Sequence, residues 1–267
     1  RFTQAYSGCT VCAPSRCALM TGKHTGHSRV RGNGDYPLLA EDTTVAQALK
    51  GAGYATGIFG KWGLGKTDTA GFPSKKGFDE FIGYLDHKHA HDQFPERLFA
   101  NTGVLPLPCN GGKNLGKYSN DLFAEKAMEF IRTHRAHPFF LYLPLTTGHF
   151  DYMLPNAEPY KGNKWPAKER FYAAMLTRMD RDIGRIMALL KELGIDDRTI
   201  MFFTSDNGPT SEGGHESSFF HSAGGLRGKK RDLYEGGIRI PMLARWPGRI
   251  KPGVVSDQAW AFWDFLP

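Results

Sequence analysis

Long apolar segments are missing from this sequence of 267 residues. No hydrophobic run approaches the ~20 residues that a membrane-spanning helix needs, so we expect no membrane partner. No recognisable nucleic-acid-binding module is present, and the basic run Lys229-Lys230-Arg231 therefore does not predict a nucleic-acid partner. The sequence also lacks Asn-x-Ser/Thr sequons, which leaves the cellular compartment open.

Cysteine is scarce, with four residues at positions 9, 12, 17 and 109. Cys9 and Cys12 have the two-residue spacing of a zinc ligand pair, but no second pair stands at zinc-ribbon spacing, so we do not expect a zinc site. The sequence does not decide whether Cys17 forms a disulfide with Cys9 or with Cys109.

The composition is that of a globular protein with a substantial core, since 40% of the residues are hydrophobic and 23% are charged. The net charge of +7 is moderate and spread along the chain, so it indicates an anionic substrate only weakly.

Apolar periodicity predicts alternating helices and strands. We expect helices from Thr44 to about residue 50, from Asp121 to about residue 134, and from Ala167 to Leu193. Apolar strands are expected at residues 55–59, 139–143, 199–204 and 238–244. Strands that are apolar on both faces and alternate with helices predict a three-layer α/β/α sandwich with a mainly parallel central sheet. In such sheets functional residues gather at the carboxyl ends of the strands.

The segment Cys12-Ala13-Pro14-Ser15-Arg16 places a thiol at the expected start of a helix, with Thr21-Gly22 as its end. A reactive group there faces unpaired backbone N–H groups and the positive end of the helix dipole. Arg16 adds a forked cationic donor that suits a tetrahedral anion. The residues thus predict a nucleophile beside an anion site, whereas an isolated cysteine before a helix is more often structural.

This segment resembles the signature of the type I sulfatases, Cys-x-Pro-Ser-Arg followed by Thr-Gly. The resemblance implies an alkaline-phosphatase-like fold and the oxidation of Cys12 to formylglycine by a maturation enzyme. The hydrated aldehyde then attacks sulfur, and sulfate leaves by elimination.

The stretch Gly60-Lys61-Trp62-Gly63-Leu64-Gly65-Lys66-Thr67 fits the P-loop pattern, but the Gly- and Pro-containing segment that follows shows no helical periodicity, so we reject a nucleotide site. The stretch also resembles the sulfatase Gly-Lys-Trp-His-Leu-Gly motif, which implies that Lys61 contacts sulfate. Gly63 stands where the family has a histidine that steadies the formylglycine hydroxyl. Its loss implies impaired turnover, or a subgroup in which His149 or a residue of the segment missing before Cys12 takes the role.

His149 follows an apolar strand, in a loop that resembles the family's histidine loop, and we expect it to protonate the leaving alcohol. Asp206 and Asn207 follow the next strand in a Ser-Asp-Asn-Gly segment that resembles the family's calcium site. Their oxygens suit Ca²⁺ or Mg²⁺. With Cys12 they are the predicted metal ligands.

The segment from Lys230 to Pro241 resembles the family's Lys-x4-Glu-Gly-Gly-x-Arg-x-Pro block, which makes Lys230 a sulfate ligand and Arg239 a substrate-binding residue. With Arg16 and Lys61, Lys230 completes a set of three cations that neutralise charge on a sulfuryl group. His215 lies on a polar loop between these motifs, and we expect it to touch the sugar or aryl part of the substrate.

Sulfatases normally begin with a strand that carries paired metal-binding aspartates, and this segment is missing before Cys12. We therefore expect residues 1–267 to be a single sulfatase catalytic domain truncated at both ends. The predicted activity is hydrolysis of sulfate esters of a small molecule or glycan, by a periplasmic or secreted enzyme. The alternatives are a phosphoesterase or phosphonate hydrolase of the same superfamily and a catalytically silent domain that binds anionic glycans.

Overall fold

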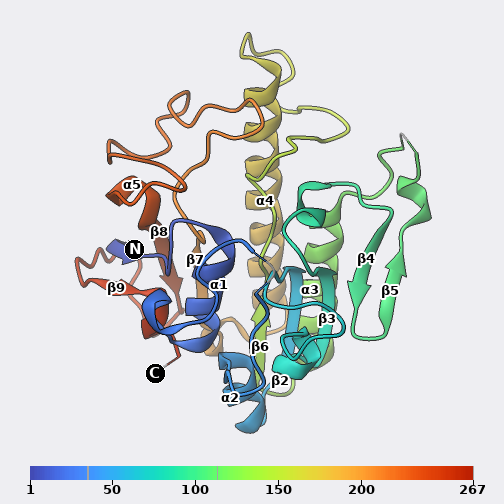
Figure 1. Ribbon diagram of the computed structural model, residues 1–267, viewed down its shortest axis with the longest axis vertical. Helices are drawn as coiled ribbons and strands as arrows, with labels where there is room; N and C mark the ends of the chain where they lie inside the picture. The colour runs from blue at the N-terminus through green and yellow to red at the C-terminus, as the bar shows by residue number, and fades with distance from the viewer. Residues whose placement is uncertain (35, 113, 267) are drawn as a thin grey trace.

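The computed structural model describes residues 1–34, 36–112 and 114–266, and its helices and strands alternate along the chain (Figure 1). The helices are α1 (Cys12–Thr21), α2 (Val45–Gly51), α3 (Ser119–His134), α4 (Ala167–Glu192) and α5 (Glu235–Ile238). The strands are β1 (Phe2–Tyr6), β2 (Ala55–Lys61), β3 (Glu80–Tyr84), β4 (Arg97–Ala100), β5 (Gly103–Pro106), β6 (Phe139–Tyr142), β7 (Met201–Thr204), β8 (Arg239–Arg245) and β9 (Trp260–Ala261).

The strands form two sheets, with the orders β5-β4-β3-β2-β6 and β7-β8-β1-β9. Strand β2 pairs in parallel with β3 and β6, and β1 pairs in parallel with β9. The other four pairings within the described part of the chain are antiparallel. The predicted α/β class is confirmed, but the strand directions are mixed rather than mainly parallel. Only residues 101–102 separate β4 from β5, and so short a connection allows only an antiparallel pair. The remaining antiparallel pairs place β4 beside β3 and β8 between β1 and β7.

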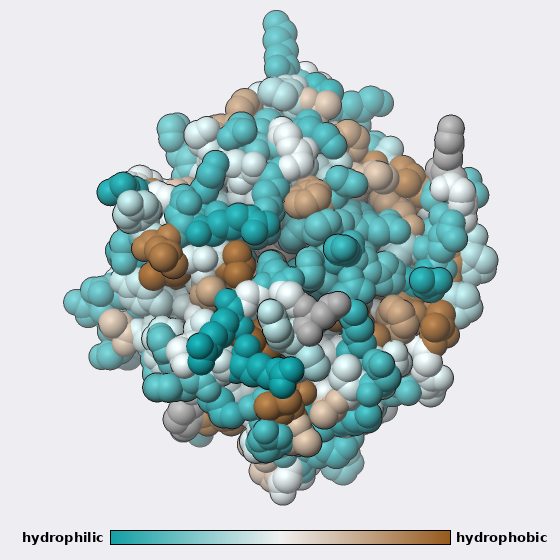
Figure 2. Space-filling model, in the orientation of Figure 1, coloured by the Kyte–Doolittle hydropathy of each residue, from teal (hydrophilic) through white to brown (hydrophobic). Residues whose placement is uncertain are grey.

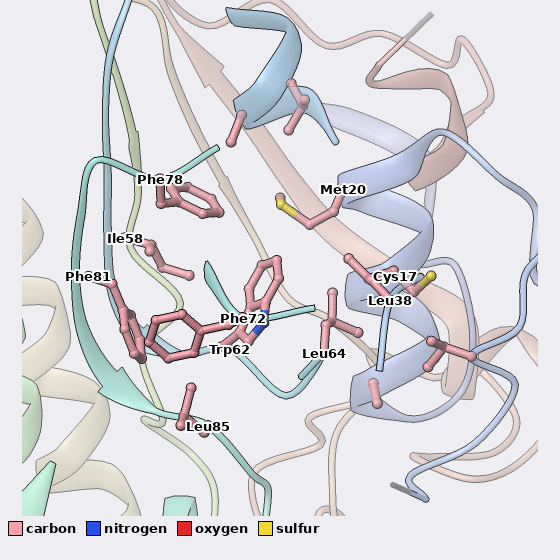
Figure 3. Close-up of a cluster of buried hydrophobic side chains, with 14 residues drawn as sticks. Cys17, Met20, Leu38, Ile58, Trp62, Leu64, Phe72, Phe78, Phe81 and Leu85 are labelled. Atoms are coloured by element: carbon pink, nitrogen blue, oxygen red, sulfur yellow. The ribbon is translucent and has the colours of Figure 1, made fainter. Parts of the chain in front are cut away.

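The larger sheet is covered by helices on both faces, as the three-layer prediction requires. Neighbouring side chains of β2 point to opposite faces, so Ile58 joins a cluster with α1 and α2 while Phe59 joins a second cluster with α3 and α4. Figure 3 shows the first cluster, where Met20 of α1 points toward Trp62 and the strand residues Ile58 and Phe81. Cys17 of α1 belongs to the same cluster. These two cores fix the positions of the strand ends that carry the polar residues.

The predicted helices and strands agree with the structure to within a few residues. Helix α4 begins at Ala167 as predicted, and α2 begins after Thr44, whose side chain forms a capping box with Gln47. No helix follows Thr67 directly; a 3₁₀ turn begins at Pro73. The segment after Thr67 therefore lacks the helix N-terminus on which a P-loop binds phosphate.

Candidate active site

Cys12 is the first residue of α1 and is 3% exposed. Gly22 ends the helix in the left-handed conformation, with φ 65°, as the Thr-Gly pair predicts. The amide of Ala13 in the first turn donates to Asn33 Oδ1 at 2.9 Å, and Cys12 Sγ lies 3.7 Å from Asn207 Oδ1. The nucleophile position is thus buried at a helix N-terminus, next to one predicted metal ligand.

Arg16 lies one turn further along α1 and is also buried. Its Nη2 and Nε donate to Asp206 Oδ2 at 2.7 and 2.9 Å, and Nη1 donates to the carbonyl oxygen of Lys61 at 2.8 Å. Burial alone would raise the pKa of Asp206, but the charges of Arg16 and Lys61 outweigh it and lower that pKa. Arg16 therefore joins α1 to the ends of β2 and β7 and keeps Asp206 ionised.

Lys61 ends β2 and is 2% exposed. Its Nζ has no hydrogen-bond partner among the described residues. Burial is the main cause that lowers its pKa; repulsion from Arg16 and Lys230 adds to it, and attraction to Cys12 and Asp206 opposes it. An unpaired buried ammonium is costly, so this group is set up to receive an anion.

Lys230 is buried on the loop before α5, and its Nζ donates to Glu212 Oε2 at 2.7 Å. Arg231 donates to Glu212 Oε1, and its amide donates to the carbonyl oxygen of Thr10, two residues before Cys12. Burial opposes the ionisation of Glu212, but the bonds from Lys230 and Arg231 lower its pKa to about 2. Glu212 therefore anchors the Lys230 side chain beside the start of α1.

His149 lies beside Lys230, with 3.5 Å between His149 Nε2 and Lys230 Nζ. His149 Nδ1 is 2.9 Å from the carbonyl oxygen of Phe150, so Nδ1 is the protonated nitrogen of the neutral ring and Nε2 is directed toward Lys230. Burial is the main cause that lowers the pKa of His149 to about 3, and Lys61 and Lys230 contribute. Without an anion in the site, His149 is therefore neutral at neutral pH.

The structure corrects the expected role of His215. This side chain is 0% exposed, and its Nδ1 lies 2.6 Å from Glu169 Oε2 of α4. Its ring stacks on Tyr172 with 3.8 Å between centroids. His215 thus packs the polar loop onto α4 and does not reach a surface where a substrate would touch it.

Arg239 does not join the other predicted site residues. Its Nε donates to the carbonyl oxygen of Thr3 at 2.8 Å, and its Nη1 donates to Glu235 at 3.3 Å. These contacts connect β8 to β1 and α5, so its predicted substrate contact has no support in the geometry.

Two further residues contact the site and were not predicted. Tyr142 ends β6 beside Arg16, where burial raises the pKa of the tyrosine and Arg16 opposes that effect. His91 stacks on His149 with 4.5 Å between ring centroids. The apolar strand around Tyr142 predicted only core packing, and the histidine-rich run from His87 to His91 was the available signal for the second residue.

The predicted metal ligands fit a hard cation in kind but not in number. Asp206 and Asn207 supply oxygen donors, whereas Ca²⁺ takes six or more. Arg16 already donates to Asp206 Oδ2, and the described residues contain no group of three or more His, Cys, Asp or Glu side chains that could hold a metal ion. These side chains alone do not form a complete metal site.

The buried nucleophile position at a helix N-terminus, with Arg16, Lys61 and Lys230 around it, has the character of a site that handles tetrahedral oxyanions. The Sulfatase family model matches residues 1–267, and the chain belongs to this family.

Curated relatives agree with the family assignment. The chain is 34% identical to the "Arylsulfatase" of Hemicentrotus pulcherrimus, over 96% of this chain and 49% of the relative. It is 31% identical to the "N-acetylgalactosamine-6-O-sulfatase" of Bacteroides thetaiotaomicron, over 94% of this chain and 61% of the relative. The chain thus spans about half the length of the arylsulfatase.

A solved structure shares the fold over the whole chain. The structure described as "Ps i-CgsB in complex with k-i-k-neocarrahexaose" has a TM-score of 0.83 and 27% identity, covering 100% of this chain and 62% of the other.

None of the helices in the described part of the chain combines the length and the apolar character needed to cross a membrane. The surface seen in Figure 2 is largely hydrophilic, with hydrophobic residues in separate patches.

Proposed function

We propose that this protein hydrolyses sulfate esters at the site around Cys12. The observation that carries the proposal is the buried, unpaired ammonium of Lys61, which is electrostatically coupled to Cys12, Arg16 and Lys230. A sulfate group in this position would satisfy the free N–H donors and offset the repulsion between the three cations.

The proposed roles follow from the contacts. Cys12, converted to formylglycine by a maturation enzyme, supplies the hydrated aldehyde oxygen that attacks sulfur. Arg16, Lys61 and Lys230 bind the sulfuryl oxygens and neutralise their charge. His149 is the acid for the leaving alcohol. Burial is the main cause that lowers its pKa, and a bound anion raises that pKa by offsetting the further lowering by Lys61 and Lys230.

We further propose that Asp206 and Asn207 contribute to a divalent metal site, with Ca²⁺ preferred and Mg²⁺ possible, and that residues 1–267 form one catalytic domain. The proposed substrate class is sulfated carbohydrate. Supporting this class are one relative named for N-acetylgalactosamine 6-O-sulfate chemistry and one neighbour solved with a carrahexaose. A periplasmic or secreted location is proposed from the family alone.

The test is coexpression with a formylglycine-generating enzyme, followed by peptide mass spectrometry across Cys12 and an assay on an aryl sulfate. We expect loss of the thiol sulfur at Cys12 together with sulfate release. Cys12→Ala should abolish both, whereas Cys109→Ser is the matched control because Cys109 is exposed and remote in sequence from the motif. Hydrolysis of an aryl phosphate or phosphonate without sulfate release would replace the proposal with the phosphoesterase alternative. Glycan binding without turnover of any ester would favour a silent binding domain.

A further inference from the structure

The short 3₁₀ turn at His89–His91 places a second imidazole against the proposed acid. The rings of His91 and His149 stack with centroids 4.5 Å apart and an angle of 27° between their planes. Phe150 completes a three-ring group, with its centroid 4.3 Å from that of His91 and 5.0 Å from that of His149. The plane of the His149 ring is therefore set by packing as well as by its own hydrogen bond.

The backbone joins the same two segments. The amide of Asp151 donates to the carbonyl oxygen of His91 at 3.1 Å. The side chain of Gln93, which is 1% exposed, donates to the carbonyl oxygen of His149 at 3.4 Å. These hydrogen bonds fix the turn and the His149 loop relative to each other, so contacts outside the two imidazole rings also keep the rings together.

The charges around the pair are mostly positive. Burial is the main cause that lowers the pKa of His91, and Lys61, His87 and Lys230 lower it further while Asp151 opposes them. The facing groups on the His149 side are Lys61, Lys230 and His91 itself. Both imidazoles are therefore neutral at neutral pH, where they stack without charge repulsion.

We propose that His91 is a positioning residue for His149, holding its ring in the plane that directs Nε2 toward Lys230 and the anion site. The hydrogen bond from Nδ1 to the carbonyl oxygen of Phe150 fixes one edge of the ring, and the His91 stack fixes its tilt. Without the stack, the ring samples other tilts and Nε2 is correctly placed for a smaller fraction of the time. The consequence for turnover rests on the proposed sulfatase function, but the geometry does not.

The experiment uses the intact mature protein with three variants, His91→Ala, His91→Phe and His89→Ala. His91→Ala removes the stacking ring, and His91→Phe keeps a ring without its nitrogens. His89→Ala is the matched control from the same turn, because the His89 ring packs instead on Tyr84 and Phe99, at 4.9 and 5.9 Å. Thermal unfolding of each variant separates loss of fold from loss of positioning.

With an aryl sulfate we expect His91→Ala to lower kcat about 2- to 12-fold with KM unchanged, the size of one aromatic pair contact. His91→Phe should restore kcat to within about twofold of the wild type, since the same aromatic contact is retained. His89→Ala should lower stability and leave kcat unchanged. An unchanged kcat in His91→Ala, or an equal loss in His91→Phe, overturns the proposal.

A second readout does not depend on turnover. NMR titration of histidine-labelled protein, with the His149 signal assigned from a His149→Gln variant, should show an upward shift of the His149 pKa in His91→Ala and not in His89→Ala. An unshifted His149 pKa in His91→Ala would contradict the packing role. A wild-type protein that releases no sulfate would sink the proposed function, while this titration would still decide the role of His91.

Discussion

Replacing Lys61 with methionine should make the protein more stable and less active. The ammonium is 2% exposed and unpaired among the described residues, so Lys61→Met removes a buried charge and keeps most of the side-chain volume. An unsatisfied buried polar group costs about 1–3 kcal/mol. We therefore expect a Tm higher by about 2–12 °C for a domain of this size.

The stability gain should depend on pH with a defined sign. The pKa of Lys61 is lowered on folding, so between the folded and the unfolded pKa values the unfolded chain binds more protons than the folded protein. The destabilisation caused by the buried ammonium therefore disappears as pH rises through that interval. The advantage of Lys61→Met should thus be largest below the folded pKa of Lys61 and shrink as pH rises toward 10.5, the unperturbed value for lysine. Urea unfolding at several pH values measures it.

Activity should change in the opposite direction, with kcat/KM for an aryl sulfate lower by about 10²–10³-fold, the usual effect of losing one preorganised donor to a developing anion. Lys76 provides the matched control, because it is also buried but its Nζ donates to the carbonyl oxygens of Asp42, Ala40 and Leu39. Lys76→Met removes these three hydrogen bonds and should destabilise the protein without changing kcat/KM. If Lys61→Met destabilises as much as Lys76→Met, the reasoning about an unpaired ammonium is refuted.

Three further predictions concern the groups around Lys61. Asp206→Asn should lower the free energy of unfolding by about 3–5 kcal/mol, because it breaks a buried ion pair with Arg16. Denaturant titration measures this loss, and a smaller loss would show that the pair is exposed in solution. The pKa of Glu212 is lowered to about 2 on folding, so the stability that its bond to Lys230 provides should be complete above about pH 4.5 and decrease as pH falls toward 2. Glu212→Gln should remove that part of the pH dependence of the free energy of unfolding. An unchanged pH dependence in this variant would contradict the stabilising role of Glu212. The pKa of His149 is lowered to about 3, so stability should decline as pH falls from 6.5 toward 3, because the unfolded chain takes up the proton first. NMR should show no titration of His149 between about pH 5 and 8 without an anion, and an upward shift of its pKa with added sulfate. An ordinary titration near 6.5 would contradict the burial of the ring.

The longer helices and the strands β2, β6, β7 and β8 were predictable because their signals are local, whereas β1, β3, β4, β5 and β9 were not predicted. The apolar periodicity of α4 and the capping residues of α2 lie within or next to the elements that they define. The sheet order was not predictable in the same way. Strand pairing joins segments as distant as β1 and β8, and the antiparallel β3, β4 and β5 follow from connections whose geometry short sequence patterns do not specify.

The site was predictable where its residues stand in contiguous motifs. Cys12 and Arg16 share one helix, so their spacing alone places them one turn apart. The polar loop was harder to interpret, because Glu212 and His215 are close in sequence but have different surroundings. Glu212 reaches the anion site through Lys230, and His215 is buried against Glu169.

The sequence by itself determined the family and yielded the predictions of the nucleophile segment and of the three cations, because each of these rests on a short run of residues. Only the tertiary structure decided which side chains have partners. Within the described part of the chain, the Lys61 ammonium is buried without a partner and His215 is buried with Glu169 as its partner. His91 stacks on His149 across 58 residues of chain. Burial and pairing depend on which segments pack together in three dimensions, and this is a property of the whole fold rather than of any single motif.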